Sequence, residues 1–263
     1  MPAIHLARLR LHAAQLAQHF EQPDELVKAL HELLDYYANR THHAGRSGEP
    51  PPLILAYHVP RPVLRQVEAE LVPLVHSDPD KAMALCDTLW KEANLEFRLI
   101  TARLLGEIPP NSQDSILRRV EAWATTCNED RLVTALAEMG LQRLREESPL
   151  VLLNQVEAWL DNEETVYIQL ALRSIAPLIS NPDFENIPGV FRLITPLARK
   201  ALAMVEPDLL DVMNVLARRT PRETFYFLRQ ILMTSDDPRT ARCVRQALKV
   251  LPIDLQSELR RAH

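Results

Sequence analysis

The chain has 263 residues, of which 47% are hydrophobic and 25% charged, and its net charge is -5. This is ordinary globular composition with enough apolar residues for a sizeable core, and the negative charge argues against a protein that coats nucleic acid indiscriminately. The chain has only 5 Gly against 20 Pro, and no stretch alternates β-branched and aromatic residues. We therefore expect an all-α protein whose prolines lie in first turns of helices and in connections.

The first 40 residues are predicted to form a pair of helices. The segment that follows, residues 41–52 (THHAGRSGEPPP), combines Gly, Ser and Pro and is predicted to be a loop. Forty residues are too few for an independent core. We therefore interpret residues 1–263 as a single helical-repeat domain, in which residues 53–263 form the main array.

Metal, cofactor and membrane sites find no support in the sequence. His5, His12 and His19 recur every seven residues, whereas metal ligands on a helix lie three or four residues apart, so a polar stripe is the better interpretation. The three cysteines form no CxxC pair, which favours a reduced, cytoplasmic setting without zinc or disulfides. No glycine-rich phosphate loop occurs, and no apolar run reaches the roughly 18 residues of a membrane span.

An internal repeat gives the clearest structural signal. The string VEAW starts at Val120 and again 36 residues later at Val156, and Trp90 lies 33 residues before Trp123. Each Trp is expected near the end of a helix, before a polar turn and a second helix. These second helices are predicted from Glu96 to Leu105, Asp130 to Leu144 and Glu164 to Ile179. This period predicts a right-handed α-solenoid of antiparallel HEAT-like hairpins, with each Trp between hairpins in the core.

The C-terminal part continues the helical pattern and is basic. Three more helices are predicted, each opening with proline: Pro207 to Arg219, Pro221 to Thr234 and Pro238 to Leu251. Residues 217–263 carry ten Lys or Arg against five acidic residues, while the remainder is net negative. Such an end is a candidate phosphate-binding surface, although a solvated charged face explains it equally well.

Three segments resemble one known family. They are LAYHVPRPVLRQVEAEL from Leu55, ALCDTLWKEANLEFRLITARLLGEIP from Ala84, and ARCVRQALKVLP, which ends at Pro252. Together they are similar to the DNA alkylation-repair glycosylases built from HEAT-like repeats. The resemblance implies that a concave face holds DNA and that alkylated purines are removed there by an Asp, neighbouring Trp residues and an Arg. A carboxylate stabilises the positive charge that glycosidic cleavage builds on the sugar, and aromatic faces hold a cationic base.

The family's residues transfer poorly to this chain. The direct alignment places Thr134 at the catalytic Asp, Asp130 at a Trp, and Leu170 at the Arg. A shifted alignment instead nominates Asp130 as the catalytic carboxylate, with an aromatic wall of Trp123, Trp159 and Tyr167. The candidate nucleic-acid-binding residues are Arg118, Arg119, Arg173, Arg242, Arg245 and Lys249.

Three functions follow from the sequence. The first is a member of the family that binds duplex DNA on its concave face but has lost or altered glycosylase activity. The second is an active alkylpurine-DNA glycosylase that uses Asp130. The third is a scaffold whose partner is another protein, a common role of helical solenoids.

Overall fold

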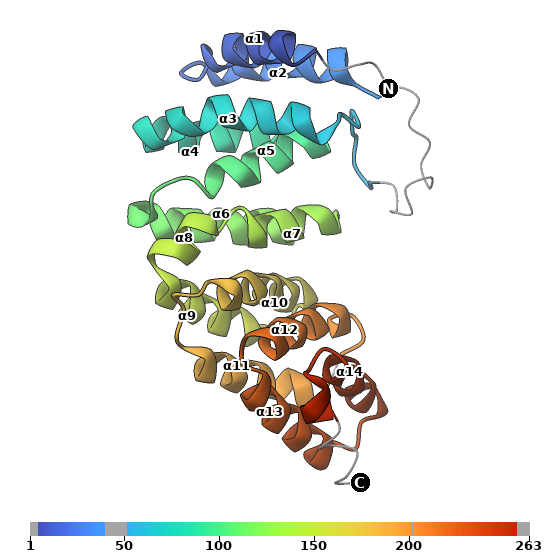
Figure 1. Ribbon diagram of the computed structural model, residues 1–263. Helices are drawn as coiled ribbons and strands as arrows, with labels where there is room; N and C mark the ends of the chain where they lie inside the picture. The colour runs from blue at the N-terminus through green and yellow to red at the C-terminus, as the bar shows by residue number, and fades with distance from the viewer. Residues whose placement is uncertain (1–4, 40–51, 201, 257–263) are drawn as a thin grey trace. The chain divides into compact units, whose positions relative to one another are not determined.

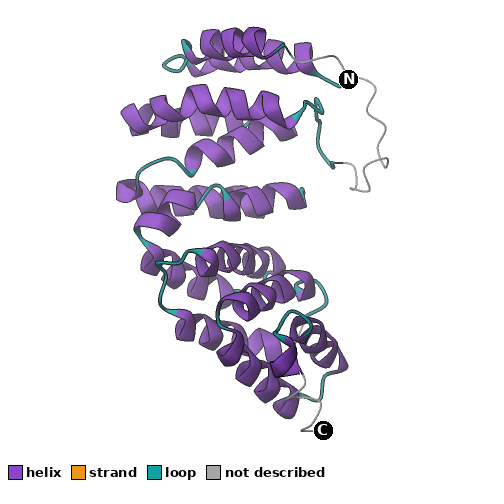
Figure 2. Ribbon diagram, in the orientation of Figure 1, coloured by secondary structure: helices purple, strands orange, loops and turns teal. Residues whose placement is uncertain are grey.

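The computed structural model describes residues 5–39, 52–200 and 202–256. Within these ranges the chain is all-α, as predicted: the helices α1–α14 and a short 3-10 helix, η1, account for the regular structure, and no β-strand is present (Figure 2). The chain divides into two compact units, Met1–Glu147 and Ser148–His263. Each unit is described by itself, and the single-domain interpretation stays a prediction.

The first unit stacks its helices in two layers (Figure 1). Helices α1, α3, α5 and α7 follow one another in one layer, while α2, α4 and α6 form the other. The bounds are α1 Leu6–Ala17, α2 Pro23–Tyr37, α3 Arg61–Ser77, α4 Pro79–Trp90, α5 Leu95–Leu105, η1 Pro110–Ser112, α6 Gln113–Thr125, α7 Asp130–Glu138 and α8 Gln142–Glu147. The predicted N-terminal pair corresponds to α1 and α2, and the predicted loop 41–52 lies outside the described residues except for Pro52.

The second unit repeats this pattern. Helices α10, α12 and α14 pack in succession, and α11 packs against α13. The bounds are α9 Pro149–Leu160, α10 Thr165–Ser180, α11 Ile187–Arg199, α12 Glu206–Arg219, α13 Pro221–Thr234 and α14 Pro238–Leu248. Antiparallel helices that stack on their neighbours are what the repeat period predicts. The HEAT type of the hairpins and the handedness of the array stay predictions.

Proline marks the helix starts, as composition suggested. It lies in the first two positions of most helices, including α2, α4, α9 and α12 to α14. Its fixed φ suits the first turn, where its missing N–H would have no helical partner. The predicted starts at Pro221 and Pro238 are therefore confirmed.

Two predicted helices end earlier than expected. The one that starts at Pro238 ends at Leu248 rather than Leu251. The expected helix from Asp130 to Leu144 is broken into α7 and α8 by a turn at residues 139–141. Gly140 in that turn weakens helix formation, and the turn packs against the end of α5. A Cβ added to Gly106 would lie 1.7 Å from the carbonyl oxygen of Met139, and the Arg143 amide donates to the Gly106 carbonyl at 3.0 Å. Tertiary packing thus overrides the helical periodicity.

The three tryptophans are core residues. Trp90, Trp123 and Trp159 are 7%, 9% and 2% exposed, and each lies in the last turns of its helix. Their burial confirms the prediction that all three are core residues. Among the described residues no helix is long and apolar enough to cross a membrane.

Candidate nucleic-acid-binding and repair site

Helix α7 carries the segment that resembles the family's catalytic stretch. Asp130 is its first residue and is exposed, and Thr134 lies one turn later and is half-buried. The Thr134 hydroxyl donates to the backbone carbonyl of Asp130 at 3.2 Å. The position that the direct alignment gives to the catalytic Asp therefore holds a neutral group. A hydroxyl offers no negative charge to an oxocarbenium-like sugar.

The carboxylate just before α7 has another role. Glu129 is 5% exposed, and its Oε2 accepts a hydrogen bond of 2.7 Å from the Leu53 amide. Glu96, at the start of α5, is 4% exposed and accepts from the amides of Tyr57 and His58 at 3.1 and 2.7 Å. Sequence reasoning missed both residues. The only signal in the sequence was one glutamate close to the start of each of the helices α5 and α7.

Two tryptophans of the first unit stack on each other. The rings of Trp90 and Trp123 lie 4.5 Å apart and are nearly parallel, at 10°. The guanidinium of Arg98, on α5, lies 5.2 Å from the ring centroid of Trp90. The Arg98 Nε donates to the Glu92 carbonyl. Most of the aromatic surface of Trp123 is thus used inside the protein, which leaves little of it to form a wall for a ligand.

The two basic candidates on α6 differ in their surroundings. Arg119 donates from Nε and Nη2 to the two carboxylate oxygens of Asp87 on α4, at 2.7 Å each. This hydrogen bonding raises the pKa of Arg119 and ties two neighbouring helices of one layer together. Arg118 is exposed, and its Nε donates to the Asp114 carbonyl of its own helix.

In the second unit the candidates on α10 are mostly buried. Leu170 is 0% exposed, so the direct alignment places a core residue where the family has an Arg. Arg173, one turn later, pairs with Asp208 of α12 at 2.8 Å, and the two side chains are only 11% and 12% exposed. Tyr167 is half-buried, whereas Trp159 belongs to the core. The structure thus keeps Arg173 in an internal ion pair.

Helix α14 presents the most open group of cations. Arg239, Arg242 and Arg245 are exposed and lie three residues apart, and Lys249 follows them at the helix end. Residues at these spacings share one helix face, opposite the buried Cys243 and Ala247. We call this face, with Arg239, Arg242, Arg245 and Lys249, the α14 basic stripe. Of its members, Arg242 pairs with Glu206 at 2.7 Å but remains 63% exposed.

Another arginine of the basic C-terminal part is used inside the fold. The guanidinium of Arg219 donates to four backbone carbonyls in the last turn of α10 and just after it, those of Ile179, Asn181, Pro182 and Phe184. It satisfies carbonyls that have no partner at a helix end. A count of basic residues in the sequence therefore overstates the positive charge that is exposed at the surface.

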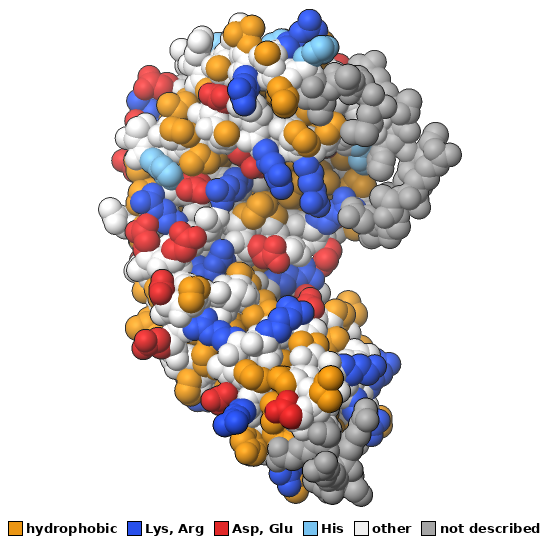
Figure 3. All heavy atoms as spheres, viewed as in Figure 1, with side chains coloured by type: hydrophobic (Ala, Val, Ile, Leu, Met, Phe, Trp, Pro, Cys, Tyr) orange, Lys and Arg blue, Asp and Glu red, His pale blue; other side chains and the backbone are white. Residues whose placement is uncertain are grey.

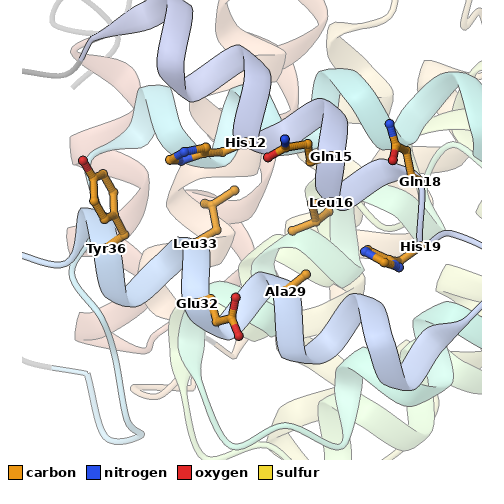
Figure 4. A pocket seen from close by; sticks show the side chains of 9 residues that line it. All are labelled: His12, Gln15, Leu16, Gln18, His19, Ala29, Glu32, Leu33 and Tyr36. Atoms are coloured by element: carbon orange, nitrogen blue, oxygen red, sulfur yellow. The ribbon is translucent and has the colours of Figure 1, made fainter.

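A pocket of about 570 Å³ lies between α1 and α2 (Figure 4). His12 of α1 and His19 of the turn after it face the pocket together with Glu32 and Tyr36 of α2. No group of three or more His, Cys, Asp or Glu residues within the described ranges could hold a metal ion. The pocket is a groove between two helices that polar and apolar side chains line together.

Stacked antiparallel helices with ion pairs between repeats define an all-α helical-repeat protein. Residues 55–250, from the segment before α3 to the end of α14, match the model of the family described as DNA alkylation repair enzyme. Because the match covers most of the chain, the chain belongs to the DNA alkylation repair enzyme family. No curated protein matches the chain. The resemblance seen in the sequence is thereby confirmed, and a function related to DNA repair follows for the family domain.

Proposed function

We propose that this protein binds duplex DNA and that its glycosylase activity has been lost or altered. Thr134 is the observation that carries the second half of the proposal. It is half-buried on α7, at the position that the direct alignment gives to the family's catalytic Asp, and its hydroxyl donates to the Asp130 carbonyl of the same helix. Without a carboxylate there, the charge stabilisation that cleavage needs must come from elsewhere or be absent.

The binding half of the proposal is supported by the α14 basic stripe. Several cations on one helix face can contact successive phosphates, and each contact releases counterions from the DNA. Arg119 and Arg173 are held by carboxylates, so phosphate would have to compete for them. We expect the stripe to contribute more to affinity than these two arginines. The concave face as the site of the DNA stays a prediction.

Binding and activity can be tested on the same preparations. The wild-type protein should bind duplex DNA with an affinity that falls as salt rises, and should release no 3- or 7-alkylated purine. The double variant Arg242→Glu with Arg245→Glu should lose most of the affinity for DNA. The slope of its affinity against salt concentration should fall by the equivalent of about two phosphate contacts. Affinity for DNA that does not depend on salt or on these residues would contradict the proposal.

An active glycosylase is the alternative that α7 itself favours. Asp130 is an exposed carboxylate one helical turn before Thr134, on the same side of the helix. If it replaces the missing Asp, the wild-type protein releases alkylated purine and Asp130→Asn abolishes the release. Release that survives in Asp130→Asn would exclude Asp130 as the catalytic group.

A protein-binding scaffold is the second alternative. The ion pairs between repeats use charges that DNA would otherwise attract, which favours a surface adapted to another protein. This function predicts no salt-dependent affinity for duplex DNA. The double variant of the α14 basic stripe would then behave as the wild type does toward DNA.

A further inference from the structure

The segment before α3 is held to the first unit by hydrogen bonds from the backbone of four residues. We call residues Pro52–Pro60 the strap. The Leu53 amide donates to Glu129 at 2.7 Å, the Leu55 carbonyl accepts from the Leu95 amide at 2.8 Å, and Glu96 accepts from the amides of Tyr57 and His58. The strap therefore runs past the starts of α5 and α7. It cannot shift without breaking several hydrogen bonds.

The two carboxylates that hold the strap are almost completely buried. Glu96 and Glu129 are 4% and 5% exposed. A buried carboxylate is costly unless it is hydrogen-bonded, and the strap amides supply those bonds. Both also lie at helix N-termini, which favour negative charge. The strap is thus held by hydrogen bonds to two buried side chains, although it is an irregular segment at the surface.

This rigid backbone displays two leucines to solvent. Leu53 is 75% exposed and Leu55 is 68% exposed, while Pro52, Ile54 and Ala56 beside them are half-buried. Single exposed leucines are common on protein surfaces, but two on an anchored segment make a fixed apolar projection. Because the backbone is already ordered, little conformational entropy is lost when these side chains meet a partner.

Positive charge lies next to the two leucines. The strap leads directly into α3, whose exposed residues include Arg61 and Arg65. Figure 3 shows Lys and Arg side chains gathered over α3 and α5. The other end of the strap is bonded to Glu129, next to the exposed Asp130 of α7. The projection therefore lies between arginines and the helix that resembles the family's catalytic stretch.

We propose that Leu53 and Leu55 form an apolar wedge that enters between base pairs of bound DNA. Proteins that kink DNA combine such wedges with arginines that hold the backbone on either side. Stacked bases are the apolar surface that duplex DNA offers, and a wedge opens it at a weakly stacked or damaged step. This inference rests on the proposed binding of DNA. It adds a role for the strap that the repair reaction itself does not require.

The test measures base stacking separately from affinity. A duplex that contains the fluorescent base 2-aminopurine brightens when that base loses its stacking. At saturating protein and low salt, the wild type should raise the fluorescence severalfold. The variant Leu53→Ala with Leu55→Ala should lose this increase while its affinity falls by no more than about tenfold, because the arginines and their phosphate contacts remain.

A matched control and the contrary outcomes complete the design. Leu150→Ala removes a leucine of similar exposure, 61%, from α9 in the second unit, and should leave the fluorescence increase unchanged. Saturable binding without brightening in the wild type overturns the wedge but not the proposed function. Brightening that survives in the double variant also overturns the wedge. A protein partner found to bind the two leucines would overturn it as well. Absence of any binding to DNA overturns both proposals.

Discussion

The two units use their charged residues for different purposes. In the first unit, Glu96 and Glu129 are buried and hold an irregular strap against the starts of α5 and α7. In the second unit, the main buried charges are Arg173 and Asp208, which join neighbouring helices, and the last helix carries exposed cations. Buried carboxylates therefore hold an irregular segment in the first unit, while the nearly buried charges of the second unit form an ion pair between two helices.

This difference teaches where chemistry could have been lost in this chain. Helix α7 packs into the core through Leu132, Val133 and Leu136, whereas Thr134, which the direct alignment predicts at the family's catalytic Asp, is half-buried. The nearest buried carboxylate, Glu129, is engaged by the strap. A change at Thr134 would therefore leave the core of this repeat intact, because Thr134 is only half-buried.

Removing the strap anchor should have the largest effect on stability. Glu96→Ala leaves the amides of Tyr57 and His58 without their acceptor and opens space in a buried site. We expect a loss of about 3 kcal/mol in the free energy of unfolding, measured with urea. Hydrogen exchange at Tyr57 and His58 should accelerate as well. The control Glu138→Ala, at an exposed position of α7, should change stability by less than about 0.5 kcal/mol.

The comparison would break if the strap proved dispensable. A Glu96→Ala protein as stable as the Glu138→Ala control would mean that the strap is held by other contacts. Glu96 would then contribute no more to the stability of the first unit than an exposed acidic residue does.

The ion pairs of the second unit provide the next largest effect. Arg173→Met leaves Asp208 unpaired in a site where both side chains are nearly buried, and should cost about 2 kcal/mol of folding free energy. Arg242→Met breaks a pair whose arginine is mostly exposed, and should cost less than about 0.5 kcal/mol. Thermal unfolding monitored by circular dichroism measures both. Equal losses would show that burial does not separate a structural pair from the α14 basic stripe.

How far the sequence predicts this molecule depends on the range of each interaction. The VEAW repeat and the prolines predicted the all-α class and the bounds of several helices, because helix periodicity and capping are local properties. The break at Gly140 was missed because it depends on contact with Gly106, far away in the sequence. The same reason hid the partners of Arg119 and Arg173, which lie one repeat away. A count of basic residues could not show which of them face solvent.

The smallest expected effect concerns two carboxyls whose pKa burial raises, one in each unit. Glu68 of α3 is half-buried, and the nearby Arg103 and Arg65 offset part of the rise in its pKa. Burial, assisted by Asp208, also raises the pKa of Asp211, which is more exposed. A raised pKa in the folded state means that the ionised form destabilises the fold. The penalty is therefore present at neutral pH and disappears as the pH falls below the ordinary carboxyl range, about 4.

Neutral replacements should remove that penalty. Glu68→Gln should raise the melting temperature at pH 7 by no more than about 2 °C, and Asp211→Asn by less, because solvent screens the more exposed group. Both differences from the wild type should shrink toward zero when the scans are repeated near pH 3. A gain that grew on acidification would mean that the carboxylates stabilise the fold when ionised.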